Sequence, residues 1–114
     1  MKVKHYTTEP LMENPFKLKV IKYHDSADGE LLHLTLTPGE SMLPHIPPVT
    51  LLYYILEGEP TVRIGDEVED VHTESYLESP GGIATCVSNN SDATVRLLIV
   101  KTVKTTEVPV FLDK

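Results

Sequence analysis

The chain has one cysteine, Cys86, so it cannot form an internal disulfide bond, which agrees with a reducing compartment. It has only two arginines, Arg63 and Arg96, and a formal net charge of −7. Phosphate contacts need clustered basic side chains, so this composition argues against nucleic acid as a partner. No apolar run approaches membrane-spanning length, and no apolar core follows the charged N-terminus. These absences predict a cytoplasmic protein without a membrane partner.

The sequence does contain a series of short β-favouring runs, and no segment carries a helical stripe of apolar residues. Turn-forming stretches such as 25–29, 79–82 and 89–92 separate the runs. Short strands at this spacing predict an all-β antiparallel sandwich or barrel, in one domain that covers residues 1–114. The predicted strands are 16–23, 31–37, 50–56, 61–64, 83–88, 93–103 and 108–112.

Two remaining features have ordinary structural interpretations. The acidic run 65–70 lacks the ligand spacing of a calcium-binding loop, and we expect a solvated hairpin turn there. Cys86 has no obvious catalytic partner in the sequence, so we expect a buried structural thiol.

One stretch has the spacing of a metal-binding motif without most of its ligands. Gly39, His45 and Gly58 stand at the positions of a glycine, a first histidine and a closing glycine, and the stretch resembles the first signature of the cupin superfamily. That signature calls for a second histidine where this chain has Pro47, and for a carboxylate where it has Leu51.

The second cupin signature has its counterpart in residues 80–89. This stretch keeps a Pro-x-Gly opening and ends in Asn89, but Thr85 stands where a further histidine is expected. Proline and leucine offer no lone pair, and a threonine hydroxyl is a poor ligand for a transition metal. The resemblance implies a double-stranded antiparallel β-barrel or jelly roll of the cupin type, and the lost ligands predict that it works without a metal or other cofactor.

The resemblance also implies which residues face the interior, because alternate residues of a strand share a face. Inward positions for His45 and Leu51 carry Tyr53 and Ile55 to the same side, with Ile83 and Thr85 facing them. His33 lies opposite three leucines, so it is either exposed or a second inward imidazole. For His45, Tyr53 and Thr85 the alternative to a ligand contact is a purely structural role in the packing of the barrel. The candidate ligand-binding residues are His45, Leu51, Tyr53, Ile55, Ile83, Thr85 and His33.

The leading functional hypothesis is a metal-independent barrel that binds a small molecule in its interior. One alternative is a metal-free isomerase or epimerase with His45 as base and Tyr53 as acid, although no catalytic residue is assigned. Another is a metal-dependent enzyme with ligands relocated to His33, His45 and His72. The runs 51–56 and 95–100 are apolar on nearly both faces, which predicts a homodimer.

Overall fold

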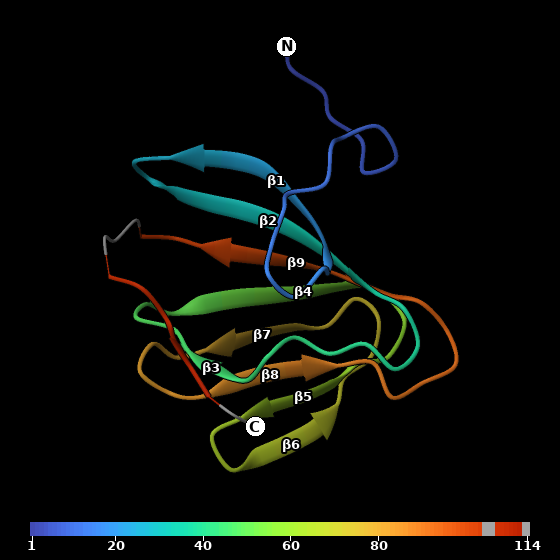
Figure 1. The fold of residues 1–114 in the computed structure, drawn as a ribbon, viewed down its shortest axis with the longest axis vertical. Helices are drawn as coiled ribbons and strands as arrows, with labels where there is room; N and C mark the ends of the chain where they lie inside the picture. The colour runs from blue at the N-terminus through green and yellow to red at the C-terminus, as the bar shows by residue number, and fades with distance from the viewer. Residues whose placement is uncertain (104–106, 113–114) are drawn as a thin grey trace.

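The computed structural model of the protein describes residues 1–103 and 107–112, which form two antiparallel sheets packed face to face (Figure 1). One sheet has the order β1-β2-β9-β4-β7 and the other has the order β10-β3-β8-β5-β6. The strands are β1 (Lys19–Ser26), β2 (Gly29–Leu36), β3 (His45–Ile46), β4 (Leu51–Glu57), β5 (Thr61–Ile64), β6 (Glu67–Asp70), β7 (Tyr76–Ser79), β8 (Thr85–Ser88), β9 (Val95–Lys101) and β10 (Val110–Phe111).

The predicted all-β antiparallel fold is confirmed as a two-sheet jelly-roll sandwich. The two sheets face each other but are not closed into a continuous hydrogen-bonded barrel. No helix in the described part of the chain is long or apolar enough to cross a membrane.

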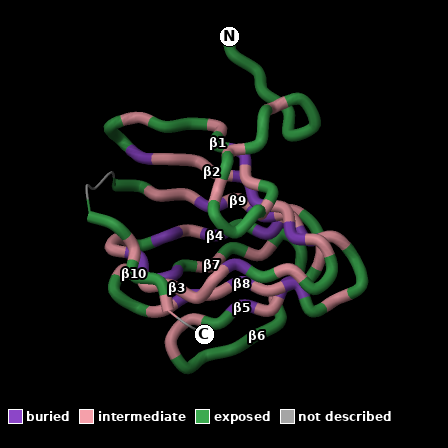
Figure 2. The backbone as a smooth tube through the Cα atoms, in the orientation of Figure 1, coloured by how far each residue is buried: buried purple, intermediate pink, exposed green. Residues whose placement is uncertain are grey.

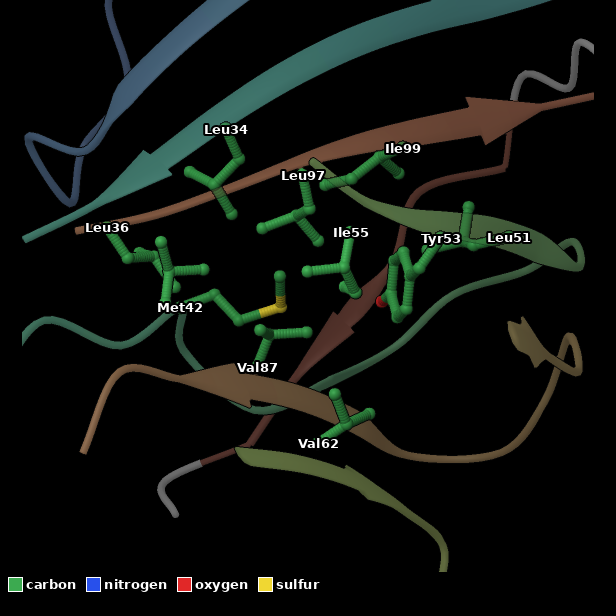
Figure 3. Close-up of a cluster of buried hydrophobic side chains, with 11 residues drawn as sticks. Leu34, Leu36, Met42, Leu51, Tyr53, Ile55, Val62, Val87, Leu97 and Ile99 are labelled. Carbon is green, nitrogen blue, oxygen red and sulfur yellow. The ribbon is translucent and has the colours of Figure 1, made fainter. Parts of the chain in front are cut away.

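The core fills the space between the sheets (Figure 3). Strands of both sheets alternate between inward apolar and outward residues, as β4 shows with buried Leu51, Tyr53 and Ile55. The inward set is completed by side chains from the other strands and from the loop before β3, namely Leu34, Leu36, Met42, Val62, Val87, Val95, Leu97 and Ile99. Burial of each large apolar side chain contributes about 1.5–3 kcal/mol, so this layer is the main source of stability.

Three strands were not predicted from the sequence. β3 and β7 are short, and β6 lies within the acidic run that we expected to be only a solvated turn. The turn is present at Gly65, but residues 67–70 then pair with β5 as an edge strand whose residues are all exposed (Figure 2). Acidic side chains on an edge strand oppose pairing with another chain, which is the usual way such edges are protected.

Candidate functional site

A cavity of about 220 Å³ opens between the two sheets on the side where β1 and β10 form the edges. Strand alternation aims apolar side chains at it from both sheets, so its walls are mainly aliphatic and aromatic. The wall residues from β1, β2, β4 and β9 include Val20, Leu32, Leu34, Leu51, Tyr53 and Ile99, and Met42 and Leu43 lie on the opposite side.

The chain segment before β1 covers this opening. Met12 pairs with Val20, and the side chain of Asn14 then organises a tight loop. Its amide donates to the carbonyl of Leu18 at 2.7 Å, and its oxygen accepts from the Leu18 backbone N–H at 3.0 Å. This loop brings Phe16 to the cavity, where its ring lies 5.4 Å from the ring of Phe111 on β10. Two aromatic side chains from distant parts of the sequence therefore meet at the entrance.

His45 is the histidine at the cavity, and one edge of its ring is already used. Its Nδ1 lies 3.0 Å from the carbonyl oxygen of Leu43. A carbonyl only accepts, so Nδ1 carries the proton and Nε2 holds the lone pair in the neutral ring. Burial lowers the pKa of His45; the hydrogen bond to Leu43 opposes this, and the positive charge of Lys101 adds to it. The ring is therefore neutral at pH 7.

The hydroxyl groups of Tyr53 and Thr85 form a buried pair that bridges the two sheets. They lie 3.0 Å apart, and both residues are almost completely buried. Burial raises the pKa of Tyr53, and its neighbours Thr85 and Ser79 oppose the shift. The Ser79 side-chain hydroxyl lies near Tyr53 but has no hydrogen-bond partner of good geometry among the described residues, although it is completely buried. The Tyr53 hydroxyl is thus hydrogen-bonded to Thr85 in the core, and its raised pKa keeps it protonated at pH 7.

A smaller cavity of about 80 Å³ continues from the first and shares His45, Leu51 and Lys101 with it. Its polar side chains are charged: Glu30 and Glu107 lie there with Lys101. The Lys101 ammonium is 3.9 Å from a Glu30 carboxylate oxygen. The apolar cavity therefore has one end at which an imidazole, an ammonium and carboxylates meet.

Most of the predicted site residues lie between the sheets, but two do not. His45, Leu51 and Tyr53 line the cavity, while Ile55 and Thr85 are buried in the adjoining core. Ile83 was expected to face the interior; instead it is 41% exposed, in the turn before β8. The chain only becomes a strand at Thr85, so alternation does not extend back to Ile83.

His33 lies on the outer face of its sheet. It is beside Leu98 of β9, and the next residue in that row is Tyr54 of β4, neither of which faces the interior. The Arg96 guanidinium donates to its Nε2 at 3.2 Å, and the ring of Tyr6 stacks on it at 5.4 Å. His33 is therefore buried under the N-terminal segment rather than inside the sandwich, and it is not part of the cavity.

Sequence reasoning missed Lys101, Phe16 and Phe111. Lys101 lies two and four residues after the inward Ile99 and Leu97, so strand alternation was a signal for its inward position. No signal in the sequence shows that Phe16 and Phe111 meet, because their contact depends on how the two chain ends pack.

The two-sheet sandwich with an interior cavity is the architecture of a jelly-roll protein, and sequence comparison supplies its family. Residues 32–101 match the cupin domain family. This match covers more than half of the chain, so the protein belongs to the cupin family. No curated protein matches the chain.

Solved structures of the same fold agree with this assignment. TT1209 from Thermus thermophilus is 25% identical, with a TM-score of 0.75 over 91% of this chain and 100% of that one. The polyketide cyclase RemF from Streptomyces resistomycificus is 22% identical, with a TM-score of 0.82 over 98% and 85% of the two chains. The DMSP lyase DddQ from Ruegeria pomeroyi is 16% identical, with a TM-score of 0.73 over 95% and 58%. Identities this low show a shared fold only.

The residues present do not fit the metal site that cupin signatures imply. Of the four signature positions, only His45 offers a good ligand, since Pro47, Leu51 and Thr85 replace the others. The Thr85 hydroxyl is also bonded to Tyr53. No group of three or more His, Cys, Asp or Glu side chains suited to a metal occurs among residues 1–103 and 107–112.

The relocated set of His33, His45 and His72 is not assembled either. His33 is on the outer face of one sheet. His72 is exposed and its Nδ1 lies 2.6 Å from a Glu59 carboxylate oxygen. The three imidazoles therefore serve three separate environments, and the hypothesis of a displaced site is wrong.

Proposed function

We propose that this cupin binds a small, mainly apolar molecule in the cavity between its sheets, with His45 as a polar contact. The observation that carries the proposal is an apolar cavity of about 220 Å³ with a neutral imidazole at its charged end. Ligand sites are typically apolar pockets in which a few polar groups fix the orientation. A ligand that fits this volume has few atoms, so we expect a Kd between about 10 µM and 1 mM.

An NMR titration with small aromatic probes tests the proposal. Chemical shifts of the methyl groups of Leu34 and Ile99, which line the cavity, are expected to change in a saturable way. Leu32→Trp fills the cavity from β2 and should abolish the effect. Leu31→Trp is the matched control, because the side chain of this neighbouring residue points to the opposite face of the same strand. Equal binding by both variants would contradict the proposal.

A second candidate function is proton transfer without a metal, with His45 as the base. The hydrogen bond from Nδ1 to Leu43 favours it, because this bond leaves Nε2 with an available lone pair. Any probe that binds can be incubated with the protein in D₂O. Enzyme-dependent deuterium uptake that is lost in His45→Gln would support this candidate, and the absence of exchange would leave binding as the function.

We also propose that the protein forms a homodimer through the outer face of the sheet that contains β4 and β9. Leu52, Tyr54 and Leu98 lie on this face and are only partly covered. Light scattering should give twice the monomer mass for the natural chain and for the control Val68→Glu, and a lower mass for Leu98→Glu. A monomer in all three cases would contradict the dimer. Cytoplasmic location stays a prediction from the sequence.

A further inference from the structure

The polar end of the cavity presents a hydrogen-bond acceptor. The Nδ1 of His45 is turned toward the Leu43 carbonyl, so the polar atom that the ring can offer to a ligand is Nε2. Phe111 lies against the ring with centroids 5.5 Å apart, which fixes the imidazole plane at the entrance. A neutral imidazole whose Nδ1 is protonated accepts at Nε2 and does not donate there. A ligand group at this point therefore has to supply a hydrogen.

The charges around His45 select against an ionised ligand group. Glu30 and Glu107 line the smaller cavity that His45 shares, and Glu30 also lies 3.9 Å from the Lys22 ammonium. A carboxylate ligand there would be attracted by Lys101 but would also meet two acids and an acceptor nitrogen to which it has no hydrogen to donate. An ammonium ligand would be attracted by the two acids but would also meet Lys101, which lines both cavities. In a partly buried place such like-charge encounters are costly, so a neutral group is favoured.

A hydroxyl group matches both polar partners at once. Its hydrogen can be donated to Nε2 of His45, and its oxygen can accept from the Lys101 ammonium. An ether or ketone has the oxygen but no hydrogen to donate. A hydroxyl is thus the smallest neutral group that complements an acceptor beside a cationic donor.

The remaining walls define the rest of the ligand. Leu32, Leu34, Met42 and Ile99 offer only apolar surface. One water occupies about 30 Å³ in the liquid, so a cavity of about 220 Å³ holds roughly the volume of seven waters, enough for a single six-membered ring and its substituent.

On the basis of the proposed function, we infer that the ligand is a neutral hydroxyl compound with a compact apolar body, a small phenol or cyclic alcohol, whose hydroxyl donates to His45 Nε2. The inference follows from the two cavities, the direction of the His45 hydrogen bond and the charged groups beside it. In this arrangement His45 determines specificity by accepting the hydrogen of the ligand hydroxyl, and Lys101 donates to the oxygen of the same hydroxyl.

The experiment compares four probes of similar size by calorimetry or NMR: phenol, anisole, benzoate and benzylamine. Anisole keeps the ring and the oxygen of phenol but lacks the hydrogen. We expect phenol to bind the natural protein about 5- to 10-fold more tightly than anisole, which corresponds to one hydrogen bond of about 1–1.4 kcal/mol. His45→Phe should remove this preference while anisole still binds. His24→Phe, which changes an exposed histidine, should keep it.

The outcomes separate the inference from the function on which it rests. Equal affinities for phenol and anisole in the natural protein, or tighter binding of benzoate or benzylamine than of phenol, would overturn the inference and leave interior binding intact. If no probe binds the natural protein, the proposed function fails and the inference falls with it. The comparison within the natural protein does not depend on whether His45→Phe folds.

Discussion

Replacing Tyr53 by phenylalanine removes a single oxygen atom from the interior, and replacing Thr85 by valine exchanges one hydroxyl for a methyl group. The two hydroxyls lie 3.0 Å apart and are enclosed by the core. Each single change therefore leaves its partner buried without its hydrogen bond. Such an orphaned group costs about 1–3 kcal/mol, whereas removal of both partners together costs much less.

The change in melting temperature can be worked out from the length of the chain. Unfolding entropy of about 2.1 cal/mol/K per residue, over 114 residues, gives about 240 cal/mol/K, so 1 kcal/mol lowers Tm by about 4 °C. We expect each single variant, Tyr53→Phe and Thr85→Val, to lose roughly 4–12 °C. The double variant should lose less than the sum of the two, which corresponds to a coupling energy of about 1 kcal/mol or more.

Urea denaturation of the four proteins, with Tm from calorimetry, measures this coupling. The slopes of the urea transitions should agree, because the changes do not alter the surface exposed on unfolding. If the effects of Tyr53→Phe and Thr85→Val are simply additive, the two hydroxyls do not stabilise each other and the argument for a structural pair is refuted. A strong coupling would show that the threonine in a metal-ligand position of the signature serves the core.

Three further predictions concern other parts of the molecule. Burial, reinforced by the Arg96 guanidinium, lowers the pKa of His33 below 6.5. Below that pH the unfolded chain therefore binds a proton that the folded chain does not yet bind, and the free energy of unfolding falls as the pH is lowered. Urea titrations at several pH values should show a weaker fall in His33→Gln; an unchanged slope would contradict this. Gly58→Ala should cost more than about 3 kcal/mol, because its Cβ would stand 2.6 Å from the Thr94 carbonyl, whereas Gly39→Ala, with equally positive φ but open space, should cost about 1–2 kcal/mol. Ser79→Ala removes a buried hydroxyl without a partner, so calorimetry should show an equal or higher Tm; a clear decrease would show that this hydroxyl has a partner in solution.

The fold was largely predictable because its longer strands are apolar and β-favouring. β9 falls within its predicted run, and β2 and β4 overlap theirs with ends shifted by one or two residues. The short and polar strands were not predictable in the same way. β6 is stabilised by pairing with β5 along an exposed edge, and local sequence preference does not show such a partner.

The site residues could be predicted only where a signature motif indicated which side chains of a strand face the interior. Once His45 was assigned inward, alternation placed Leu51 and Tyr53 correctly at the cavity. His33 had no such reference, and the sequence left both faces open. Its burial depends on Arg96 and Tyr6, which reach it from another strand and from the N-terminal segment. Contacts of this kind are tertiary, so strand periodicity cannot reveal them.

The cupin signatures combine residues that shape the backbone with residues that bind a metal, and this chain keeps mainly the first kind. The positions that keep the family residue shape the backbone: a Cβ on Gly58 would stand 2.6 Å from the Thr94 carbonyl oxygen, and Gly82 has a φ of +81°. Asn89, completely buried, donates to the carbonyls of Leu36 and Ala93 at 2.9 and 2.8 Å. The positions that lost a ligand, by contrast, lie at the cavities or in the core beside them, as Leu51 does.

Backbone geometry at the turns requires glycine and asparagine whatever the protein binds, because a larger residue would collide or leave buried carbonyls without a donor. The interior positions have no such requirement and can change with the ligand. The resemblance to cupins therefore predicts the fold of this protein but not its chemistry. For that reason the ligand has to be inferred from His45, Lys101 and the apolar walls around them, rather than from the family.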